Sequence, residues 1–254
     1  MILLIDIGNS LTKIALGDEI TQKITLLKPI ISKEKNWNNN IKKLILQIKN
    51  KVNKTIISTV IPDKLTEITK IITTILKTKP IILNGNLIKN LPIKVNTGTK
   101  EIGSDLIALA IGSYHKYQSS IIVSLGTATT YTIIKDNVIL GIIIGPGFND
   151  AKNSLTANAA LIKPFTIKPY QSVLGNTTNH ALSIGYGNGF NYMIDTTITA
   201  INNELKSNLP VIITGGNFQE LKPFFHFKYQ YDQDILILGL MIIYQMQEKN
   251  NKLN

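Results

Sequence analysis

The sequence predicts an α/β protein of two similar halves, residues 1–117 and 118–254, with a central cleft between them. Three observations support this prediction. A series of short apolar stretches separated by glycine turns opens the chain and starts again after residue 118, and strand and helix patterns alternate behind each series. Hydrophobic residues make up 44% of the 254 residues, which is enough for large buried cores. No low-complexity linker separates the halves, which favours a tight cleft over a loose tether.

The first half begins with a strand meander and continues with alternating helices and strands. Its expected strands are residues 2–7, 11–17, 20–27, 55–60 and 80–83, with a tight turn at Gly17-Asp18 after the second. Its expected helices are residues 36–50, a segment with apolar positions from Leu65 to Leu76, and Ser104 to about Tyr117. Residues 84–102 are rich in Gly, Asn, Pro and Thr and are expected to form a loop.

The second half repeats the meander over SSIIVSLGTATTYTIIKDNVILGIII, residues 119–144, with its last turn at Lys135-Asp136-Asn137. A further buried strand, residues 210–214, ends in Gly215-Gly216 ahead of a helix. The closing helix is expected over about 235–248, followed by a frayed tail. Residue identity between the halves is slight, so the predicted repeat depends on the order of the elements.

Composition narrows the classes of function. The net charge is +11, but all 27 basic residues are lysines spread along the chain, and no basic block with interleaved aromatic residues indicates nucleic-acid binding. The chain has no cysteine and three scattered histidines, so metal chemistry would depend on oxygen ligands. No apolar run approaches the roughly 20 residues of a membrane helix. We therefore expect a cytoplasmic protein with no membrane partner.

The opening stretch MILLIDIGNSLTKIAL ends a buried strand in a carboxylate and turns back at once. In Asp6-Ile7-Gly8-Asn9-Ser10, backbone N–H groups and short polar side chains share one sharp turn, the kind of geometry that cradles phosphate. Asp6 is placed to hold Mg²⁺ through water. Lys13 on the following strand could neutralise phosphate charge or simply be exposed. Taken alone, the stretch more often forms an ordinary hairpin turn.

Two further motifs favour a phosphate-binding turn over an ordinary hairpin turn. Gly126-Thr127-Ala128-Thr129-Thr130 is a glycine turn with three hydroxyl groups at the matching place in the second half. Two phosphate turns facing across a cleft suit a nucleoside triphosphate. Thr214-Gly215-Gly216 ends a buried strand, where the backbone can pack flat against an adenine or ribose. Each motif alone is common in α/β proteins, and the ordered set is more specific.

In these motifs the chain resembles the type III pantothenate kinase family, a branch of the acetate and sugar kinase, heat-shock chaperone and actin superfamily. The resemblance covers nearly the whole chain. Besides the motifs above, it is carried by Ser58 to Pro62, Gly103-Ser104-Asp105, Gly141 with Gly145-Pro146-Gly147, Gly175-Asn176-Thr177, Gly185 with Gly189, and Leu236 to Leu240.

The resemblance implies two ribonuclease-H-like (actin-like ATPase) domains with the active site between them. It implies ATP-dependent phosphorylation of pantothenate, the first step of coenzyme A biosynthesis, by a homodimer that uses Mg²⁺ and a monovalent cation, K⁺ or NH₄⁺. Asp6 would then serve Mg²⁺, the two turns would hold phosphates, and Gly215 and Gly216 would lie near the nucleoside.

The resemblance also assigns roles around the start of the helix at 104. Asp105 would be the general base that takes the proton from the primary hydroxyl of pantothenate, and Gly103, Ser104, Leu106 and Thr177 would help to bind this substrate. The residues alone leave a second interpretation of Asp105, because an acid in the first turn of a helix is stabilised by the helix dipole, typically by ~0.3–1 kcal/mol.

The chain departs from the family pattern at several positions. Leu106 replaces an arginine that usually follows the aspartate, and the whole chain has no arginine. Lysine cannot copy the two parallel bonds that arginine makes to a carboxylate. Ser124 and Thr132 stand where aspartates are usual, so a monovalent cation at Ser124 would lack the usual charge. Ile142 replaces the second of a pair of glycines, and Thr99 replaces a proline.

Three functions therefore stay open at the level of sequence. The first is an active pantothenate kinase. The second is a related kinase with another small hydroxylated substrate. This function stays open because the missing arginine affects binding of the substrate more than transfer of the phosphoryl group. The third is a non-catalytic, nucleotide-binding accessory or regulatory relative. Turnover of ATP with pantothenate separates the three.

Overall fold

The computed structural model describes residues 1–84, 87, 91–96 and 102–253. Contacts divide the chain into two compact units. Unit 1 is Met1–Gln118 with Lys135–Leu140 and Asp234–Asn254, and unit 2 is Ser119–Ile134 with Gly141–Gln233. These units follow the expected break near residue 118 but take two later segments into unit 1. The expected domain boundaries and the cleft stay predictions.

Unit 1 is built on a mixed sheet. Its strands are β1 (Ile2–Ile7), β2 (Leu11–Gly17), β3 (Ile24–Leu26), β4 (Ile30–Ile31), β5 (Lys54–Thr59) and β6 (Ile81–Ile82). They follow the order β3-β2-β1-β5-β6, and β4 pairs with β2. Strand β1 runs antiparallel to β2 and parallel to β5. Every residue of β1 is buried, as expected for a central strand covered on both faces.

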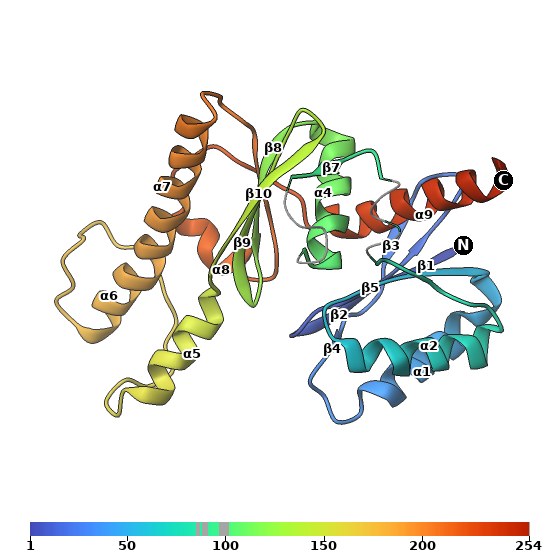
Figure 1. Ribbon diagram of the computed structural model, residues 1–254. Helices are drawn as coiled ribbons and strands as arrows, with labels where there is room; N and C mark the ends of the chain where they lie inside the picture. The colour runs from blue at the N-terminus through green and yellow to red at the C-terminus, as the bar shows by residue number, and fades with distance from the viewer. Residues whose placement is uncertain (85–86, 88–90, 97–101, 254) are drawn as a thin grey trace. The chain divides into compact units, whose positions relative to one another are not determined.

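Two pairs of helices complete unit 1. They are α1 (Trp37–Ile48), continued by the 3₁₀ turn η1 (Lys49–Lys51), α2 (Pro62–Leu76), α4 (Ser104–Tyr117) and α9 (Ile235–Leu253). Figure 1 shows α1 and α2 side by side along the sheet, and buried Ile side chains of both helices belong to one core with β1 and β2. Helices α4 and α9 pack closely on each other. The expected helix from Ser104 to Tyr117 is confirmed.

Most of a second sheet, with the same order of strands, lies in unit 2. Its strands are β8 (Ser120–Leu125), β9 (Ala128–Lys135), β10 (Val138–Pro146), β11 (Val211–Thr214) and β12 (Gln230–Tyr231). The short strand β7 (Lys94–Val95) pairs with Val138 and Ile139 at the start of β10, and these four residues fall in unit 1. Leaving aside the short β4 and β7, each sheet places the third, second, first, fourth and fifth strands of its half side by side. This common order confirms the repeat that the sequence predicts.

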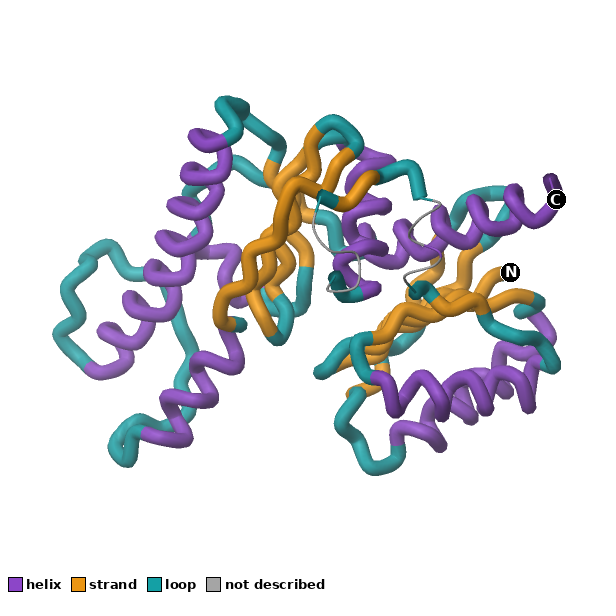
Figure 2. The backbone as a smooth tube through the Cα atoms, viewed as in Figure 1, coloured by secondary structure: helices purple, strands orange, loops and turns teal. Residues whose placement is uncertain are grey.

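The helices of unit 2 follow its strands in the chain. They are α5 (Phe148–Asn158), α6 (Thr178–Ser183), the π-helical turn η2 (Ile184–Asn188), α7 (Gly189–Glu204), α8 (Phe218–Leu221) and the 3₁₀ turn η3 (Lys222–Phe224). Figure 2 shows the sheet strands in orange and the helices in purple. Among the described residues, no helix is both long enough and apolar enough to cross a membrane.

Three element boundaries differ from the sequence predictions. The strand expected at 20–27 begins only at Ile24, because the Asp18 carboxylate accepts the N–H groups of Ile20 and Thr21 at 2.9 and 2.8 Å and extends the turn. The loop expected at 84–102 contains strand β7, while Thr99 lies outside the described residues. The closing helix was expected to end at about residue 248 and continues to Leu253, while fraying of its end stays a prediction.

Candidate active site

The first turn lies at the ends of β1 and β5 in unit 1. The strand register pairs Asp6 with Lys13 of β2 on one side and with Ser58 of β5 on the other. Paired residues of neighbouring strands point to the same face, so these three side chains form one row. The turn itself is closed by the Gly8 N–H, which donates to the Leu11 carbonyl at 3.0 Å. Asn9 and Ser10 are exposed at its tip.

Asp6 is a buried carboxylate with an unusual protonation equilibrium. Its side chain is 5% exposed, and its Oδ1 has no hydrogen-bond partner among the described residues. Burial and the negative charge of Asp105 raise the pKa of Asp6 to about 7, although Lys13 and Ser58 act in the opposite direction. An unpaired, buried carboxylate oxygen is a ligand that Mg²⁺ prefers, so this site fits the ion.

Asp105 lies in the first turn of α4, close enough to Asp6 for their charges to interact. Burial raises the pKa of Asp105, while the N–H groups of Leu106 and of Asp105 itself, and the charge of Lys13, lower it in part. The N–H groups show that the helix start does stabilise this acid. The structure therefore joins Asp6, Lys13 and Asp105 in one electrostatic cluster.

Ser104 fixes the position of this helix start. Its Oγ accepts the Thr59 N–H at 3.1 Å, donates to the Thr59 carbonyl at 3.0 Å and lies 3.0 Å from Ser58 Oγ. The end of β5 and the start of α4 are thereby tied together. Substrate binding by Ser104, Gly103 and Leu106 stays a prediction, and all three are half-buried.

The second turn lies between β8 and β9 in unit 2, where Gly126 N–H donates to the Ala128 carbonyl at 3.1 Å. Gly215 lies directly against it. Its φ is +104°, and a Cβ there would come within 2.5 Å of the Leu125 carbonyl oxygen. Only glycine tolerates both the left-handed conformation and this approach. The structure therefore brings the Gly126 turn and the Gly215-Gly216 bend together, as the ordered motifs suggested.

Asn149 and Asn217, which the sequence analysis did not single out, also lie beside the second turn. Asn217 Nδ2 donates to the Gly126 carbonyl at 3.0 Å, and Asn149 Nδ2 donates to Asn217 Oδ1 at 2.7 Å. Asn149 lies in the first turn of α5, two residues after Gly147, and a Cβ at Gly147 would collide with the Thr127 carbonyl. No local pattern could have paired residues 149 and 217, because they are 68 positions apart.

Ser124 lies two residues before Gly126 of the second turn, in a row of hydroxyl groups. The register pairs it with Thr214 of β11 and Thr130 of β9, and Thr132 follows Thr130 on the same face. The hydroxyl oxygens of Thr132 and Thr214 are buried without a hydrogen-bond partner among the described residues. This row offers a cation neutral oxygens and no carboxylate.

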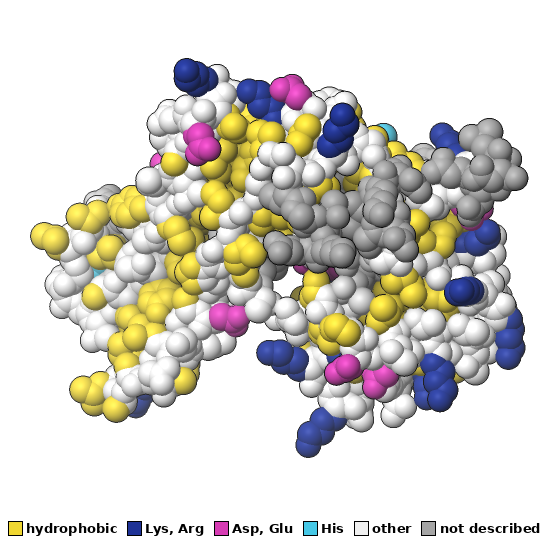
Figure 3. Space-filling model, in the orientation of Figure 1, with side chains coloured by type: hydrophobic (Ala, Val, Ile, Leu, Met, Phe, Trp, Pro, Cys, Tyr) yellow, Lys and Arg dark blue, Asp and Glu magenta, His cyan; other side chains and the backbone are white. Residues whose placement is uncertain are grey.

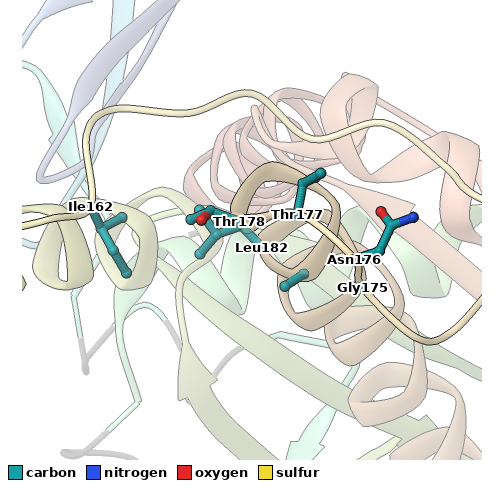
Figure 4. A pocket seen from close by; sticks show the side chains of 7 residues that line it. Ile162, Gly175, Asn176, Thr177, Thr178 and Leu182 are labelled. Carbon is teal, nitrogen blue, oxygen red and sulfur yellow. The ribbon is translucent and has the colours of Figure 1, made fainter.

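Thr177 lies elsewhere in unit 2, at the start of α6, where its Oγ1 accepts the His180 N–H at 3.2 Å. It borders an open groove of about 620 Å³, and Figure 4 shows Ile162 on one side with Thr177, Thr178 and Leu182 on the other. Residues of the Gly126 turn and of Gly215-Gly216 do not line this groove. The role of Thr177 in binding pantothenate stays a prediction.

Two sheets of matching strand order, each with a glycine turn after its first strand, define the actin-like ATPase and sugar kinase class of folds. Solved structures agree on the fold. The chain is similar to a conserved Baf family protein from Campylobacter jejuni, with a TM-score of 0.62 and 22% identity over 97% of this chain and 99% of that one. An activator of 2-hydroxyisocaproyl-CoA dehydratase from Clostridium difficile, with bound ADPNP, gives a TM-score of 0.57 at 12% identity over 99% and 97% of the chains.

Within this class, the chain belongs to the type III pantothenate kinase family. Residues 2–200 match the family. The type III pantothenate kinase of Pelagibacter ubique is 34% identical over 246 residues, which cover 95% of this chain and 97% of the relative. That of Ehrlichia canis is 29% identical over 100% and 99% of the two chains. The resemblance seen in the sequence is confirmed, as is the fold class of two ribonuclease-H-like domains.

Proposed function

We propose that this chain transfers a phosphoryl group from ATP to pantothenate, giving 4'-phosphopantothenate and ADP in the first step of coenzyme A biosynthesis. Family membership supports the substrate. The observation that carries the proposal is the pair of carboxylates at the first turn, Asp6 with a free buried oxygen and Asp105 at the start of α4. Phosphoryl transfer depends mainly on positioning and charge neutralisation, which such a pair can provide.

Asp105 is the proposed general base. It accepts the proton of the pantothenate primary hydroxyl as that oxygen bonds to the γ-phosphorus and the bond to the β-phosphate oxygen breaks, releasing ADP. The raised pKa of Asp105 makes it a stronger base than an ordinary aspartate. Leu106, beside it, can contribute apolar contact but no charge, so the pantothenate carboxylate must be held by other donors.

The remaining predicted site residues bind ATP in this proposal. Asp6 would hold Mg²⁺ together with water and phosphate oxygens, and the bound ion neutralises charge on the phosphates. Lys13 adds positive charge beside Asp6. Asn9, Ser10 and the backbone N–H groups that follow Gly8 bind phosphate, as does the turn comprising Gly126, Thr127, Ala128, Thr129 and Thr130. Gly215 and Gly216 lie near the nucleoside.

The proposal includes a monovalent cation, K⁺ or NH₄⁺, bound more weakly than a site with a carboxylate would bind it. At Ser124 it would be held by the hydroxyl row with Thr130 and Thr214 and by backbone carbonyls. A carboxylate would add attraction that these neutral oxygens do not supply. We therefore expect K⁺ or NH₄⁺ to change turnover only slightly.

The test is a turnover assay on the purified chain. With ATP, Mg²⁺ and pantothenate we expect ADP and phosphorylated pantothenate in equal amounts, measured with and without K⁺ or NH₄⁺. ADP release with another small alcohol, but not with pantothenate, would favour the second kinase function. Nucleotide binding without turnover on pantothenate or its analogues would favour a non-catalytic accessory protein.

A homodimer is also part of the proposal. Unit 2 exposes several large apolar side chains, namely Ile143, Ile144, Leu161, Val173, Leu174 and Tyr192. Exposed apolar side chains that form a contiguous patch are typical of interaction surfaces. We expect sedimentation equilibrium to give twice the monomer mass of 28.1 kDa, and Ile144→Lys, at a side chain 69% exposed, to weaken the dimer. Monomeric wild-type protein at micromolar concentration would contradict the dimer.

The proposed location is the cytoplasm, with no nucleic-acid partner. Figure 3 shows lysine side chains in dark blue, scattered singly over the visible face. Such scattering differs from the basic stripe that tracks a nucleic-acid backbone.

A further inference from the structure

Three backbone segments of unit 2 meet at the second turn. They are the turn itself at Leu125 and Gly126, the start of α5 at Gly147, and the bend Gly215 to Asn217. Gly147 is buried against the Thr127 carbonyl, and Gly215 is packed on the backbone of Leu125. The Asn217 N–H donates to the Leu125 carbonyl at 3.0 Å. Sheet pairing fixes only the strands on either side, so the turn depends on these neighbours for its shape.

The Asn217 side chain has a forced orientation. It faces the Gly126 carbonyl at 3.0 Å, and a carbonyl can only accept, so the NH₂ group of Asn217 must point to it. The Asn217 Oδ1 then points to Asn149, whose own NH₂ group donates at 2.7 Å. The two amides thus form a directed chain of hydrogen bonds from α5, through the N-cap residue of α8, to the turn, and the orientation of each amide fixes that of the next.

A second pair of side chains, Lys152 and Glu220, connects α5 and α8 beside the pair of Asn149 and Asn217. Lys152 of α5 forms an ion pair with Glu220 of α8, three residues after Asn149 and Asn217 respectively. The Lys152 side chain is 13% exposed, and its ammonium lies 4.9 Å from the centre of the Phe148 ring. The start of α5 is therefore joined to α8 at two points one helical turn apart, which resists rotation of one against the other.

We propose that Asn217, held by Asn149, is a positioning residue that sets the conformation of the Gly126–Thr130 turn for binding the phosphates of ATP. This inference rests on the proposed function of that turn and adds two residues to it. The Gly126 carbonyl is drawn toward Asn217, which orients the peptide planes and hence the N–H groups of the following residues. A turn that already has its binding conformation binds phosphate without the entropic cost of ordering the turn.

The test compares four variants and one control variant by the Kd for the non-hydrolysable analogue ADPNP with Mg²⁺, and by KM and kcat where turnover occurs. Asn217→Ala and Asn217→Asp both remove the donor to Gly126, and we expect each to raise the Kd and the KM for ATP by up to about tenfold, the upper end of the effect of losing one half-buried hydrogen bond. The KM for pantothenate and the thermal midpoint should change little. Asn158→Ala is the matched control, because Asn158 donates to the Ser154 carbonyl at the far end of the same helix α5. It should leave the Kd unchanged.

The direction of the amide chain gives a sharper test at Asn149. In Asn149→Ala the bond from Asn217 to Gly126 survives, so the Kd should rise only about twofold. In Asn149→Asp the new carboxylate attracts the Asn217 NH₂ group, turns the amide over and sets its oxygen against the Gly126 carbonyl. Although it keeps the shape of asparagine, Asn149→Asp should therefore raise the Kd more than Asn149→Ala.

The outcomes separate this inference from the proposed function. Wild-type protein that binds ADPNP but does not phosphorylate pantothenate would overturn the function, while the Kd series would still decide the role of Asn217. Unchanged Kd values in both Asn217 variants would overturn the positioning role, as would a milder effect of Asn149→Asp than of Asn149→Ala. A wild-type chain that binds no nucleotide would overturn both.

Discussion

Asp105→Asn is expected to lower phosphorylation of pantothenate by about 10²- to 10⁴-fold, the range that a general base typically contributes. Asparagine keeps the size and the hydrogen-bonding oxygen but cannot accept the hydroxyl proton. Binding of Mg²⁺ with ADPNP should persist, because Asp6 and the turns are untouched. The pKa of Asp6 should fall, since the charge of Asp105 helps to raise it. Steady-state kinetics with a separate nucleotide-binding titration measure both effects.

Asp63→Asn is a matched control for this prediction. Asp63 is exposed in the first turn of α2, in the same helical position as Asp105 in α4. If Asp105 only stabilised its helix, the two variants would behave alike, with a small loss of stability of ~0.3–1 kcal/mol and unchanged turnover. Equal kinetics for both variants would remove the general base from the proposal and leave the helix-dipole interpretation.

Gly239→Ala is expected to lower the free energy of unfolding by about 3 kcal/mol or more, at the upper end of overpacking effects. Gly239 of α9 faces Gly112 of α4, and a Cβ at Gly239 would collide with the Ala108 carbonyl. Since the obstacle is backbone, the two helices must move apart. Leu240, next to Gly239, and Ile111, next to Gly112, are fully buried, so separation would open this part of the core. The thermal midpoint should fall by about 6–12 °C.

Gly189→Ala provides the comparison for this variant. Gly189 is the first residue of α7, and a Cβ there would meet nothing within 4 Å. Alanine favours the helix over glycine by up to about 1 kcal/mol, so this variant should be as stable as the wild type or slightly more so. A thermal midpoint for Gly239→Ala that matches the Gly189→Ala value would show that the α4–α9 contact is looser than described.

Local sequence was sufficient for much of the fold. The helix predicted to begin near Ser104 and to end at about Tyr117 has these bounds in the structure, because a glycine and a short polar side chain precede an unbroken apolar run. The turn at Asp136 and Asn137 was also clear, and both residues adopt positive φ, as a two-residue hairpin requires. By contrast, strand β7 was missed, since Lys94 and Val95 pair only with distant Val138 and Ile139. A strand of two residues forms only where a neighbouring strand provides hydrogen-bond partners, and local sequence does not reveal that neighbour.

By itself, the sequence determined the repeated order of strands, the two glycine turns and the family, because apolar periodicity and turn residues act over a few positions. Only the tertiary structure decided which side chains meet. The strand register sets Lys13 and Ser58 beside Asp6, burial and Asp105 raise the pKa of that carboxyl group to about 7, and Asn149 reaches Asn217 across 68 positions. Protonation and hydrogen bonding depend on distance in space, which distance along the chain does not reveal.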